Sequence, residues 1–552
     1  MNLLLCSVFG PFGVDDEYGR QGNKMELFHN QITREQGIFS YRFHHASFGL
    51  YFIAENLRTP VTVLDFPNEK EFIDEVKKGY THVGISFILP NIKKASRMAD
   101  LIREFAPESE IILGGHGTAH RDIETLIDCD HVCRGEGVAW LRKFFGEPTD
   151  TPLVHPLVNS AQDRRVMGVK LPSDSGVIIP GVGCPNKCRF CSTSHYFKNY
   201  IPFLSTGREI FNVCQRYEKE MGITDFGVLD ENFMKHTERM YELLELMEKN
   251  NKFYTFSIFS SAETLVSLKD YNILSRLGIK VIWVGVESKT EIYDKNRGIN
   301  LKILFAQLQK RGISILASAI LFLEHHDKTT IWEDIDYAID LKPEYLQFME
   351  LGPMPDTELY KEYKKKNILS QNVPFEEMHG QDKIWFDHPD FTREESAKWL
   401  KAAFQRDYEI NGASFLRYVR TALRGYEWGV NNSDRKIRKR AENEKKSILE
   451  LRYFLMASTL FSQNSSTSLL IRDIKSRYLR LFNGNDLKTR LYSFIVTLMS
   501  IKYFLFMKAG VEMPQPSMKS KKFRSDKYIT SEPLCAEPEI PVVSNHPISR
   551  SA

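Results

Sequence analysis

Six short apolar runs, separated by stretches with helical periodicity, follow one another between residues 176 and 350. Their lengths and their content of β-branched residues are typical of buried strands. The runs are GVIIPG (176–181), ITDFGVLD (223–230), YTFSIFS (254–260), KVIWVGVES (280–288), ISILASAILF (313–322) and EYLQFME (344–350). Six strand–helix units in succession predict an α/β fold with a partial (β/α)6 barrel of the TIM type over residues 170–388, whose chemistry lies at the strand ends.

A second set of alternating elements precedes the barrel. Its apolar runs are LLLCSV (3–8), VTVLD (61–65), HVGISF (82–87), EIILGG (110–115) and HVCRG (131–135). KKASRMADLIREFA (93–106) has the spacing of an amphipathic helix between two of these strands. We therefore predict a doubly wound, Rossmann-like α/β domain over residues 1–155, with a ligand site at the carboxyl ends of its strands.

The chain becomes helical after the barrel, and we expect a helical C-terminal domain over residues 389–510. The charge-rich segment 433–446 is typical of a solvated helix face, with an anionic partner as the alternative. LYSFIVTLMSIKYFLFM (491–507) is apolar but short of the roughly 20 residues of a spanning helix, and Lys502 interrupts it. A buried core helix is favoured there, with a membrane-surface helix as the alternative. Residues 511–552 are rich in Pro, Ser and Lys without periodicity, which predicts a disordered tail.

Composition indicates in which cellular compartment the protein works and which classes of partner it binds. The chain has eight cysteines in 552 residues, which is too few for a disulfide framework and favours a reducing cytoplasm. The N-terminus MNLLLCSVFG has no basic region, so it reads as a strand and not as a signal peptide. The net charge of +3 gives no reason to expect a nucleic-acid partner.

Three of the cysteines are clustered in GVGCPNKCRFCSTSHYF (181–197), at Cys184, Cys188 and Cys191. Thiolates on such a loop can converge on a soft metal centre, and three of them leave one iron of an iron–sulfur cubane free. A structural zinc site needs a closed tetrahedral set, for which His195 could be the fourth ligand. Both interpretations stay open on spacing alone.

The C-x3-C-x2-C spacing, with the aromatic Phe190 before the last cysteine and a barrel strand ahead of it, resembles the radical S-adenosylmethionine (SAM) enzymes. The resemblance implies a [4Fe-4S] cluster on the three cysteines, with its open iron bound by the amino and carboxylate groups of S-adenosylmethionine. Reductive cleavage then gives a 5′-deoxyadenosyl radical, for which the protein provides position and shielding.

The later strand ends carry the residues that the resemblance assigns to the S-adenosylmethionine pocket. Polar contacts to the methionine moiety are expected after the second strand, and a carboxylate contact after the third. WVGVES matches the family's fourth-strand Gly-x-Glu-Ser pattern, and a buried carboxylate there needs a partner. The implied pocket residues are Phe190, Asp230, Glu231, Asn232, Ser260, Glu287 and Ser288, with Ser261 as a further candidate.

The first domain, fused directly ahead of the barrel, resembles the cobalamin-binding domain of the cobalamin-dependent subfamily. Small residues after its strands line the slot for the nucleotide tail in that family, because glycine lets a bulky ligand approach the backbone. The matching residues are Ser86, Leu89, Gly114, Gly115, His116, Gly135 and Glu136.

The chain departs from the pattern of many cobalamin proteins at the lower cobalt ligand. It lacks the Asp-x-His-x-x-Gly motif, and FGPFGVDDEYGRQGN (9–23) has no histidine before His29. Some subfamily members bind cobalamin without such a ligand. The alternatives in this chain are His44, His45, His116 and His120. Cys129 and Cys133 are better explained as core residues.

These resemblances imply an enzyme that cleaves S-adenosylmethionine and transfers a methyl group, through cobalamin, to an unactivated carbon. Cyclisation, rearrangement and carbon–carbon coupling are alternatives within the class, because fold and cofactor do not select among them. An iron–sulfur or zinc protein without catalytic activity is the alternative of another class. Expected partners are a small-molecule substrate, slightly favoured as hydrophobic by the apolar helical region, and an external one-electron reductant such as flavodoxin or ferredoxin.

Overall fold

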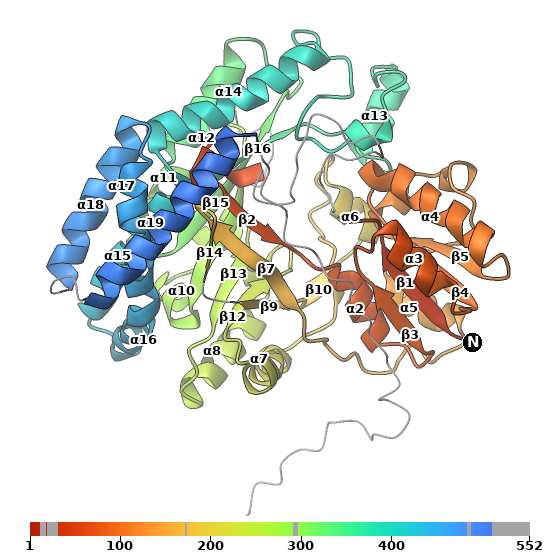
Figure 1. Ribbon diagram of the computed structural model, residues 1–552, viewed down its shortest axis with the longest axis horizontal. Helices are drawn as coiled ribbons and strands as arrows, with labels where there is room; N and C mark the ends of the chain where they lie inside the picture. Colours follow the sequence, from red (N-terminus) through yellow and green to blue (C-terminus); the bar gives the residue numbers. More distant parts are fainter. Residues whose placement is uncertain (11–17, 19–30, 172–173, 291–295, 483–486, 511–552) are drawn as a thin grey trace, which may run out of the picture.

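The computed structural model describes residues 1–10, 18, 31–171, 174–290, 296–482 and 487–510. Two lobes lie side by side, an α/β lobe formed by the N-terminal region and a larger lobe formed by a curved sheet and the C-terminal helices (Figure 1). The predicted disordered tail, residues 511–552, lies outside the described residues. Both predicted α/β units are present.

The N-terminal lobe contains a five-stranded parallel sheet in the order β3-β1-β4-β5-β6. Its strands are β1 (Leu3–Ser7), β3 (Val61–Leu64), β4 (His82–Ser86), β5 (Glu110–Gly114) and β6 (His131–Val132). Its helices are α2 (Phe48–Glu55), α3 (Glu69–Val76), α4 (Ile92–Phe105) and α5 (Gly137–Phe144). Side chains of α3 and α4 pack on one face, and those of α2 and α5 on the other. This arrangement confirms the doubly wound prediction, and the strand order reverses between β1 and β4, where such sheets bind ligands.

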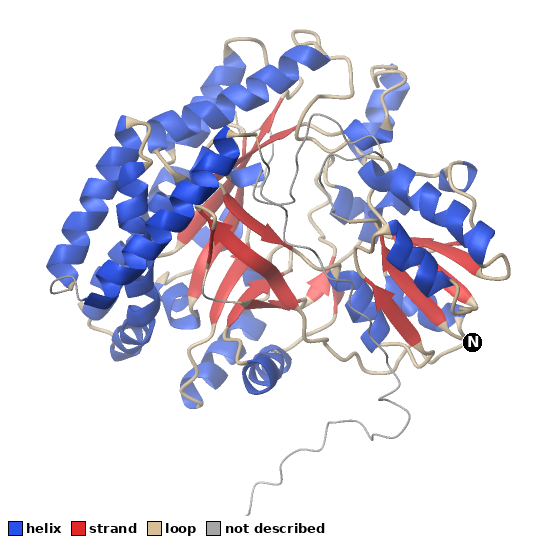
Figure 2. Ribbon diagram, in the orientation of Figure 1, coloured by secondary structure: helices blue, strands red, loops and turns tan. Residues whose placement is uncertain are grey.

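The second lobe is built on six parallel strands that pair in chain order. They are β9 (Ser175–Ile178), β12 (Asp225–Val228), β13 (Thr255–Phe259), β14 (Ile279–Glu287), β15 (Ser314–Leu321) and β16 (Tyr345–Glu350). The helices after the strands are α7 (Gly207–Met221), α8 (Thr237–Lys249), α9 (Ala262–Val266), α10 (Asn272–Leu277), α11 (Leu301–Lys310), α12 (Thr330–Asp340) and α13 (Glu358–Lys366). Helices cover the outer face of the sheet (Figure 2), with which they form the largest apolar core. The partial barrel is confirmed.

Two strands that the sequence does not reveal extend this sheet beyond β9. β7 (Asn159–Val166) pairs antiparallel with β9, and β2 (Tyr41–His44) pairs antiparallel with β7. A short strand, β8 (Val169–Lys170), pairs with the other end of β7. Because β2 comes from the range 1–155, the sheet of the second lobe includes a strand from within the predicted first domain. The two lobes are therefore joined by more than one crossing of the chain (Figure 1).

The region 389–510 is helical as predicted. Its helices are α14 (Arg393–Asn411), α15 (Ser414–Val430), α16 (Arg435–Leu451), α17 (Leu455–Leu460), α18 (Ser465–Leu481) and α19 (Leu487–Lys508). The charge-rich helix α16 is tied to the barrel, since Lys436 pairs with Glu248 and the buried Arg440 donates to the Tyr254 carbonyl at 2.8 Å. Its charges thus contribute to packing as well as to a solvated face.

The favoured expectation for residues 491–507, a buried core helix, is wrong. Only 22% of the most apolar stretch of α19 is buried. In the part of the chain that the structure describes, α19 is the one helix with the length and composition to cross a membrane. Mean hydropathy does not reveal this, because three of the five residues that α19 buries are Ser or Thr, while all its Leu residues, Phe494 and Ile495 are exposed.

Candidate active site

A short hairpin presents the three clustered cysteines at the edge of the barrel. Its strands are β10 (Gly181–Val182) and β11 (Ile201–Pro202), and the helix α6 (Ser192–Phe197) lies between them. Gly183 begins the cysteine loop with φ of +84°, and a Cβ atom there would lie 2.2 Å from the Asn199 carbonyl oxygen. Only glycine fits this turn, which fixes the direction in which the loop leaves β10.

Hydrogen bonds within the loop hold the cysteines together. The Cys191 N–H donates to the Cys188 carbonyl at 2.9 Å, and Nε2 of His195 donates to the same carbonyl at 3.2 Å. Burial raises the pKa of the Cys184 thiol, and nearby Cys191 and Glu231 raise it further. Three partly exposed thiols on one loop suit an iron–sulfur centre with an open position. Nε2 of the His195 ring, which the zinc interpretation needs as a ligand, is used in holding the loop.

Arg189, between two of the cysteines, fastens the loop to the far side of the barrel. Its guanidinium forms ion pairs with Glu324, after β15, and with Glu362 on α13, the latter at 3.1 Å. Its carbonyl accepts a hydrogen bond from the Leu359 N–H at 3.0 Å. The ring of the following residue, Phe190, packs against the barrel core. These contacts set the depth of the cysteine loop relative to the strand ends.

Asp230, at the end of β12, is committed to a buried ion pair. Its Oδ2 accepts from Arg239 of α8 at 2.7 Å and from the Tyr200 hydroxyl at 2.9 Å, while Oδ1 accepts from the Asn232 N–H at 3.1 Å. The side chains of Asp230 and Arg239 are only 2% and 3% exposed. The neighbouring Glu231 is exposed, whereas Asp230 is not. Of these two carboxylates, Glu231 is therefore the one placed for a ligand.

Asn232 joins the ends of β12 and β13. Its Oδ1 accepts from the Ser260 hydroxyl and from the Ser261 N–H, both at 3.2 Å. Its Nδ2 donates to the Ser261 and Thr264 hydroxyls at 3.2 and 3.0 Å. The predicted residues of the second and third strand ends thus form one polar network. Lys235, on the same loop, donates to Asn186 of the cysteine loop at 3.3 Å, so the network adjoins the cysteines.

Glu287 ends β14 in a strained conformation. Its φ is +61°, the register with β15 shifts between Gly285 and Glu287, and its side chain is buried. Asn296 supports the turn by donating to the Gly285 and Val286 carbonyls, each at 2.9 Å. A non-glycine residue in the left-handed region is uncommon and clusters at functional sites. The next residue, Ser288, is buried and bonds to the Thr290 hydroxyl at 2.8 Å.

A cavity of about 330 Å³ opens at the carboxyl ends of the N-terminal sheet. Its walls are mostly apolar and come from β4, β5, α2, α5 and the segment after β6. Six of the residues expected at a cobalamin slot line it: Ser86, Gly114, Gly115, His116, Gly135 and Glu136. The seventh, Leu89, is buried next to this region without lining the cavity. The cavity lies where a doubly wound sheet binds ligands.

Backbone geometry explains the residue types in the cavity wall. Gly115 has φ of +82°, and a Cβ atom there would lie 2.6 Å from the Phe87 carbonyl oxygen. Glu136 caps α5, since its carboxylate accepts from the N–H groups of Val138 and Ala139 at 2.6 and 2.7 Å. Burial lowers the pKa of His116 to about 4, so its ring is neutral.

The side of the cavity that faces the barrel is made by residues that the sequence did not single out. Tyr196 and Phe197 of α6, directly after the cysteines, line the cavity together with Phe203. The Tyr196 hydroxyl donates to the Gly115 carbonyl at 3.1 Å, and its ring stacks on His116 with centroids 4.7 Å apart. The aromatic pair in SHYF was the available signal. One short helix therefore connects the cysteine loop with the cavity of the other lobe.

Two of the other histidines considered as cobalt ligands, His45 and His120, do not line the cavity. The side chain of His45 bonds to the Ser160 carbonyl through Nδ1, and His120 packs edge-on against Phe375. His44 lies in β2, and its side chain is outside the described residues. Cys133 is buried and Cys129 packs against the lobe core, in line with their interpretation as core residues.

Residues 178–338 match the sequence model of the radical SAM superfamily. The match runs from the end of β9 into α12, so it contains the cysteine loop and the polar strand ends. Residues 178–338 are a radical SAM domain. The match is confined to the barrel lobe, and the cavity lobe lies ahead of it.

Two curated relatives match a longer part of the chain. The anaerobic magnesium-protoporphyrin IX monomethyl ester cyclase of Rubrivivax gelatinosus is 23% identical over 328 residues, which cover 51% of this chain and 58% of the cyclase. The bacteriochlorophyllide d C-12(1)-methyltransferase of Chlorobaculum tepidum is 24% identical over 338 residues, covering 55% of this chain and 70% of that enzyme. The chain thus spans little more than half the length of the cyclase, and neither match assigns it an activity.

A solved structure shares the architecture beyond the radical SAM domain. It is the radical S-adenosylmethionine methyltransferase TsrM from Kitasatospora setae, with cobalamin and a [4Fe-4S] cluster bound. The TM-score is 0.53 at 14% sequence identity, over 81% of this chain and 99% of TsrM. The predicted fold class, an α/β lobe followed by a partial barrel and a helical region, is confirmed.

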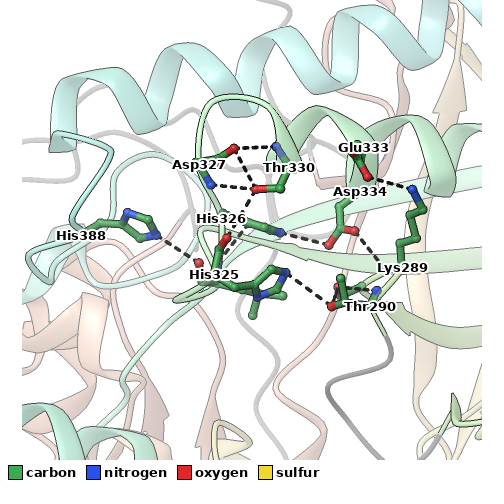
Figure 3. Close-up of polar contacts among 11 residues, drawn as sticks. Lys289, Thr290, His325, His326, Asp327, Thr330, Glu333, Asp334 and His388 are labelled. Carbon is green, nitrogen blue, oxygen red and sulfur yellow. Dashed lines mark hydrogen bonds and ion pairs between the residues drawn. The ribbon is translucent and has the colours of Figure 1, made fainter.

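On the rim of the radical SAM domain, His325, His326 and Asp334 lie close enough to hold a metal ion (Figure 3). The hydrogen bonds point to a different role. Nδ1 of His326 accepts from the Leu323 N–H at 3.1 Å, and its Nε2 donates to Asp334 at 3.0 Å. Asp334 also accepts from the Lys289 N–H at 3.0 Å. With both ring nitrogens engaged, His326 braces the loop after β15 against α12 and the end of β14.

Glu350, the last residue of β16, gives the stability of the barrel lobe a testable pH dependence. Burial raises the pKa of its carboxyl to about 8, and the charge of Asp382 adds to the shift. In the unfolded chain the pKa is near 4.3, so between about pH 4.3 and 8 the unfolded state releases a proton that the folded state keeps, and stability falls as pH rises.

The Glu350→Gln variant stays neutral and avoids this loss. We expect the free energy of unfolding of the variant, relative to that of the wild type, to rise by roughly 3 kcal/mol between pH 5 and pH 8, because the amide's own desolvation cost is the same at both pH values. Urea unfolding at both pH values measures the difference. A gain that does not grow with pH would contradict the assignment.

Proposed function

We propose that this protein is a cobalamin-dependent radical SAM enzyme that transfers a methyl group to an unactivated carbon of a small molecule. The observation that carries the proposal is the position of α6, which begins at the cysteine loop and ends in the wall of the apolar cavity. Two cofactor sites that share a helix lie close enough to serve one substrate.

The cysteine loop suits a [4Fe-4S] cluster in number, spacing and setting. Cys184, Cys188 and Cys191 would hold it, and Arg189 would fix its depth through Glu324 and Glu362. When bound, the cluster and S-adenosylmethionine supply a 5′-deoxyadenosyl radical, and cobalamin supplies the methyl group. The ring of Phe190 packs on the barrel core beside the cysteines and shields this region from water.

The strand ends supply the groups that bind and orient S-adenosylmethionine. Glu231 and Glu287 offer carboxylates to an ammonium group, which carries only donors. The network of Asn232, Ser260 and Ser261 places hydroxyl groups for a carboxylate. Asp230 positions Asn232 and does not contact the ligand itself, since its carboxylate accepts from the Asn232 N–H and is neutralised by Arg239.

The cavity of the N-terminal lobe suits the nucleotide tail of cobalamin. Its glycine-rich and apolar wall accepts a flat, bulky group close to the backbone. Burial keeps His116 neutral, and its ring, stacked on Tyr196, offers a flat face to the cavity. The helix cap made by Glu136 holds the floor of the cavity, so this carboxylate positions the wall and does not carry the ligand.

The exposed lysines around the cysteine loop favour an acidic redox partner. Lys187 and Lys198 lie within the hairpin, and Lys235 lies next to it. An acidic flavodoxin or ferredoxin would be steered to this edge, from which an electron has a short path to the cluster. The substrate is a small molecule, and the apolar helical region favours a hydrophobic one.

Anaerobic reconstitution tests the proposal. We expect a brown protein that absorbs at about 400 nm. After reduction it should release 5′-deoxyadenosine from S-adenosylmethionine. With hydroxocobalamin and S-adenosylmethionine labelled in its methyl group, label should appear in the bound cobalamin and then in a product from candidate extracts. A colourless zinc protein that reductant leaves unchanged would contradict an enzyme. Cleavage without label transfer to cobalamin would contradict methyl transfer.

A second reaction, ring formation, is favoured by the similarity to a protein named as a cyclase. The same experiment separates the two, because a cyclisation leaves no label in the product.

A substitution that fills the cavity should weaken cobalamin binding without affecting the iron–sulfur cluster. Gly114 ends β5 in the cavity wall, and a Cβ atom there meets its nearest neighbour, the Ile85 carbonyl oxygen, at 4.0 Å. The Cβ atom of Gly114→Leu therefore fits without a clash, and the rest of the side chain takes up room in the cavity. We expect cobalamin binding to weaken at least about 100-fold, or about 2.7 kcal/mol, with cluster content unchanged.

The control is Gly227→Ala in β12, where the added Cβ atom makes ordinary contacts at 3.6 Å outside the cavity. It should bind cobalamin as the wild type does. Undiminished cobalamin binding by Gly114→Leu would place the cofactor elsewhere.

A further inference from the structure

The helix α19 exposes most of its apolar side chains, and three of its five buried residues are Ser or Thr. Five of its residues are buried, namely Ser493, Val496, Thr497, Ser500 and Tyr503. Nine are exposed large apolar residues, namely Leu487, Leu491, Tyr492, Phe494, Ile495, Leu498, Met499, Leu505 and Met507. The described part of the chain exposes 21 such residues, so one helix carries nine of them. A concentration of this kind marks an interaction surface.

The orientation of α19 is fixed by close packing and is not a loose attachment. The Thr497 and Ser500 hydroxyls donate to the carbonyls four residues earlier, at 2.7 and 2.8 Å, so they are satisfied within the helix. Small side chains let the backbone approach α17 and the turn at 452–454. Tyr503 is 3% exposed, and a Cβ atom added to Gly168 would lie 2.6 Å from its Cβ atom. Turning α19 over would lose these contacts.

The exposed face extends onto the adjoining helix. α17 packs against α19 and carries the exposed Met456 and Leu460, at 50% and 59%. Figure 1 shows α19 lying along the outside of the helical region, away from the N-terminal lobe and its cavity. The surface is thus separate from the radical SAM site.

The charged residues of α19 indicate which kind of partner covers its exposed apolar face. α19 contains Lys488, Arg490, Lys502 and Lys508 and no acidic residue. All four basic side chains are exposed. A second copy of the chain would bring two sets of four positive charges together, whereas an apolar helix face flanked by basic residues is the pattern of helices that lie in the interface of an anionic bilayer.

The same packing argues for lying on the membrane and against crossing it. One side of α19 is held by the protein, since Val496 and Tyr503 belong to the apolar core of the helical region. Crossing would require α19 to leave that core. We propose that α19 docks the protein on the surface of an anionic membrane, with Phe494, Ile495 and Leu498 at the level of the acyl chains and the basic side chains among the phosphates.

The test is sedimentation of the full chain with vesicles. We expect it to bind phosphatidylcholine vesicles that contain phosphatidylglycerol about tenfold more tightly than pure phosphatidylcholine, and to be released by high salt. Ile495→Ser with Leu498→Ser changes only exposed side chains and should reduce binding at least about tenfold. Ile303→Ser is the matched control, since Ile303 on α11 is 61% exposed and lies outside this surface.

Circular dichroism and thermal unfolding establish that the variant with Ile495→Ser and Leu498→Ser, called the double variant below, still folds. Lys488→Gln with Arg490→Gln should abolish the preference for phosphatidylglycerol. Three results would overturn the proposal: no binding to either vesicle, unchanged binding of the double variant, or resistance of bound protein to alkaline carbonate, which marks a spanning helix. A dimer that the double variant converts to a monomer, with no vesicle binding, would assign the surface to a second copy.

Discussion

The Cys188→Ala variant, reconstituted with iron and sulfide, is expected to hold no intact cluster and to cleave S-adenosylmethionine more than about 1000-fold more slowly than the wild type, a loss of about 4 kcal/mol. The reason is the ligand count. Three thiols leave one iron position open, and two leave a cluster without enough support to persist under reduction. Cys188 is only partly buried, in a loop closed by the pair β10 and β11, so its removal leaves the core intact.

The measurement is iron and sulfide content together with 5′-deoxyadenosine release. Cys129→Ala is the matched control, because Cys129 is also partly buried but packs in the N-terminal lobe. It should keep both cluster and cleavage. Cobalamin binding by Cys188→Ala should persist, since the cavity wall from α6 begins after the loop. Wild-type cleavage by this variant would remove Cys188 from the ligand set.

The sequence predicted the strands well because each one carries its own signal. The runs at 280–288 and 313–322 are continuous apolar segments, and β14 and β15 occupy them almost residue for residue. β7 reads NSAQDRRV and has no such signal. It forms a strand because β9 and β2 supply partners on both sides, and that pairing is a long-range fact that local periodicity does not contain.

The site shows the same division between local and long-range information. The cysteine spacing and the glutamate that ends β14 are local patterns, and their elements lie where the sequence places them. The engagement of Asp230 by Arg239 depends on how α8 packs back over the end of β12, which the motif does not specify. Tyr196 lines the cavity because the two lobes are in contact, and local sequence does not specify that contact. For α19, hydropathy measured how apolar the helix is but not which of its faces is buried.

The Arg239→Met variant should lose about 3–5 kcal/mol of stability, because it leaves the Asp230 carboxylate buried without its cation. The Tyr200 hydroxyl and the Asn232 N–H still donate to Asp230, but neither neutralises a charge that is 2% exposed. The exposed pair of Arg97 and Glu69, whose side chains are 42% and 40% exposed, provides the comparison. Arg97→Met should cost less than about 1 kcal/mol, because water screens that pair.

Urea unfolding of the two variants, with Asp230→Asn added to Arg239→Met, distinguishes a buried charge from lost packing. If the charge is the cause, the double variant regains part of the stability, since asparagine can keep the hydrogen bonds without a charge. If packing is the cause, the second substitution recovers nothing. Because Asp230 Oδ1 also holds the Asn232 N–H, Arg239→Met should raise the KM for S-adenosylmethionine at temperatures where it remains folded. An unchanged KM would separate the ion pair from the pocket and leave it a purely structural role.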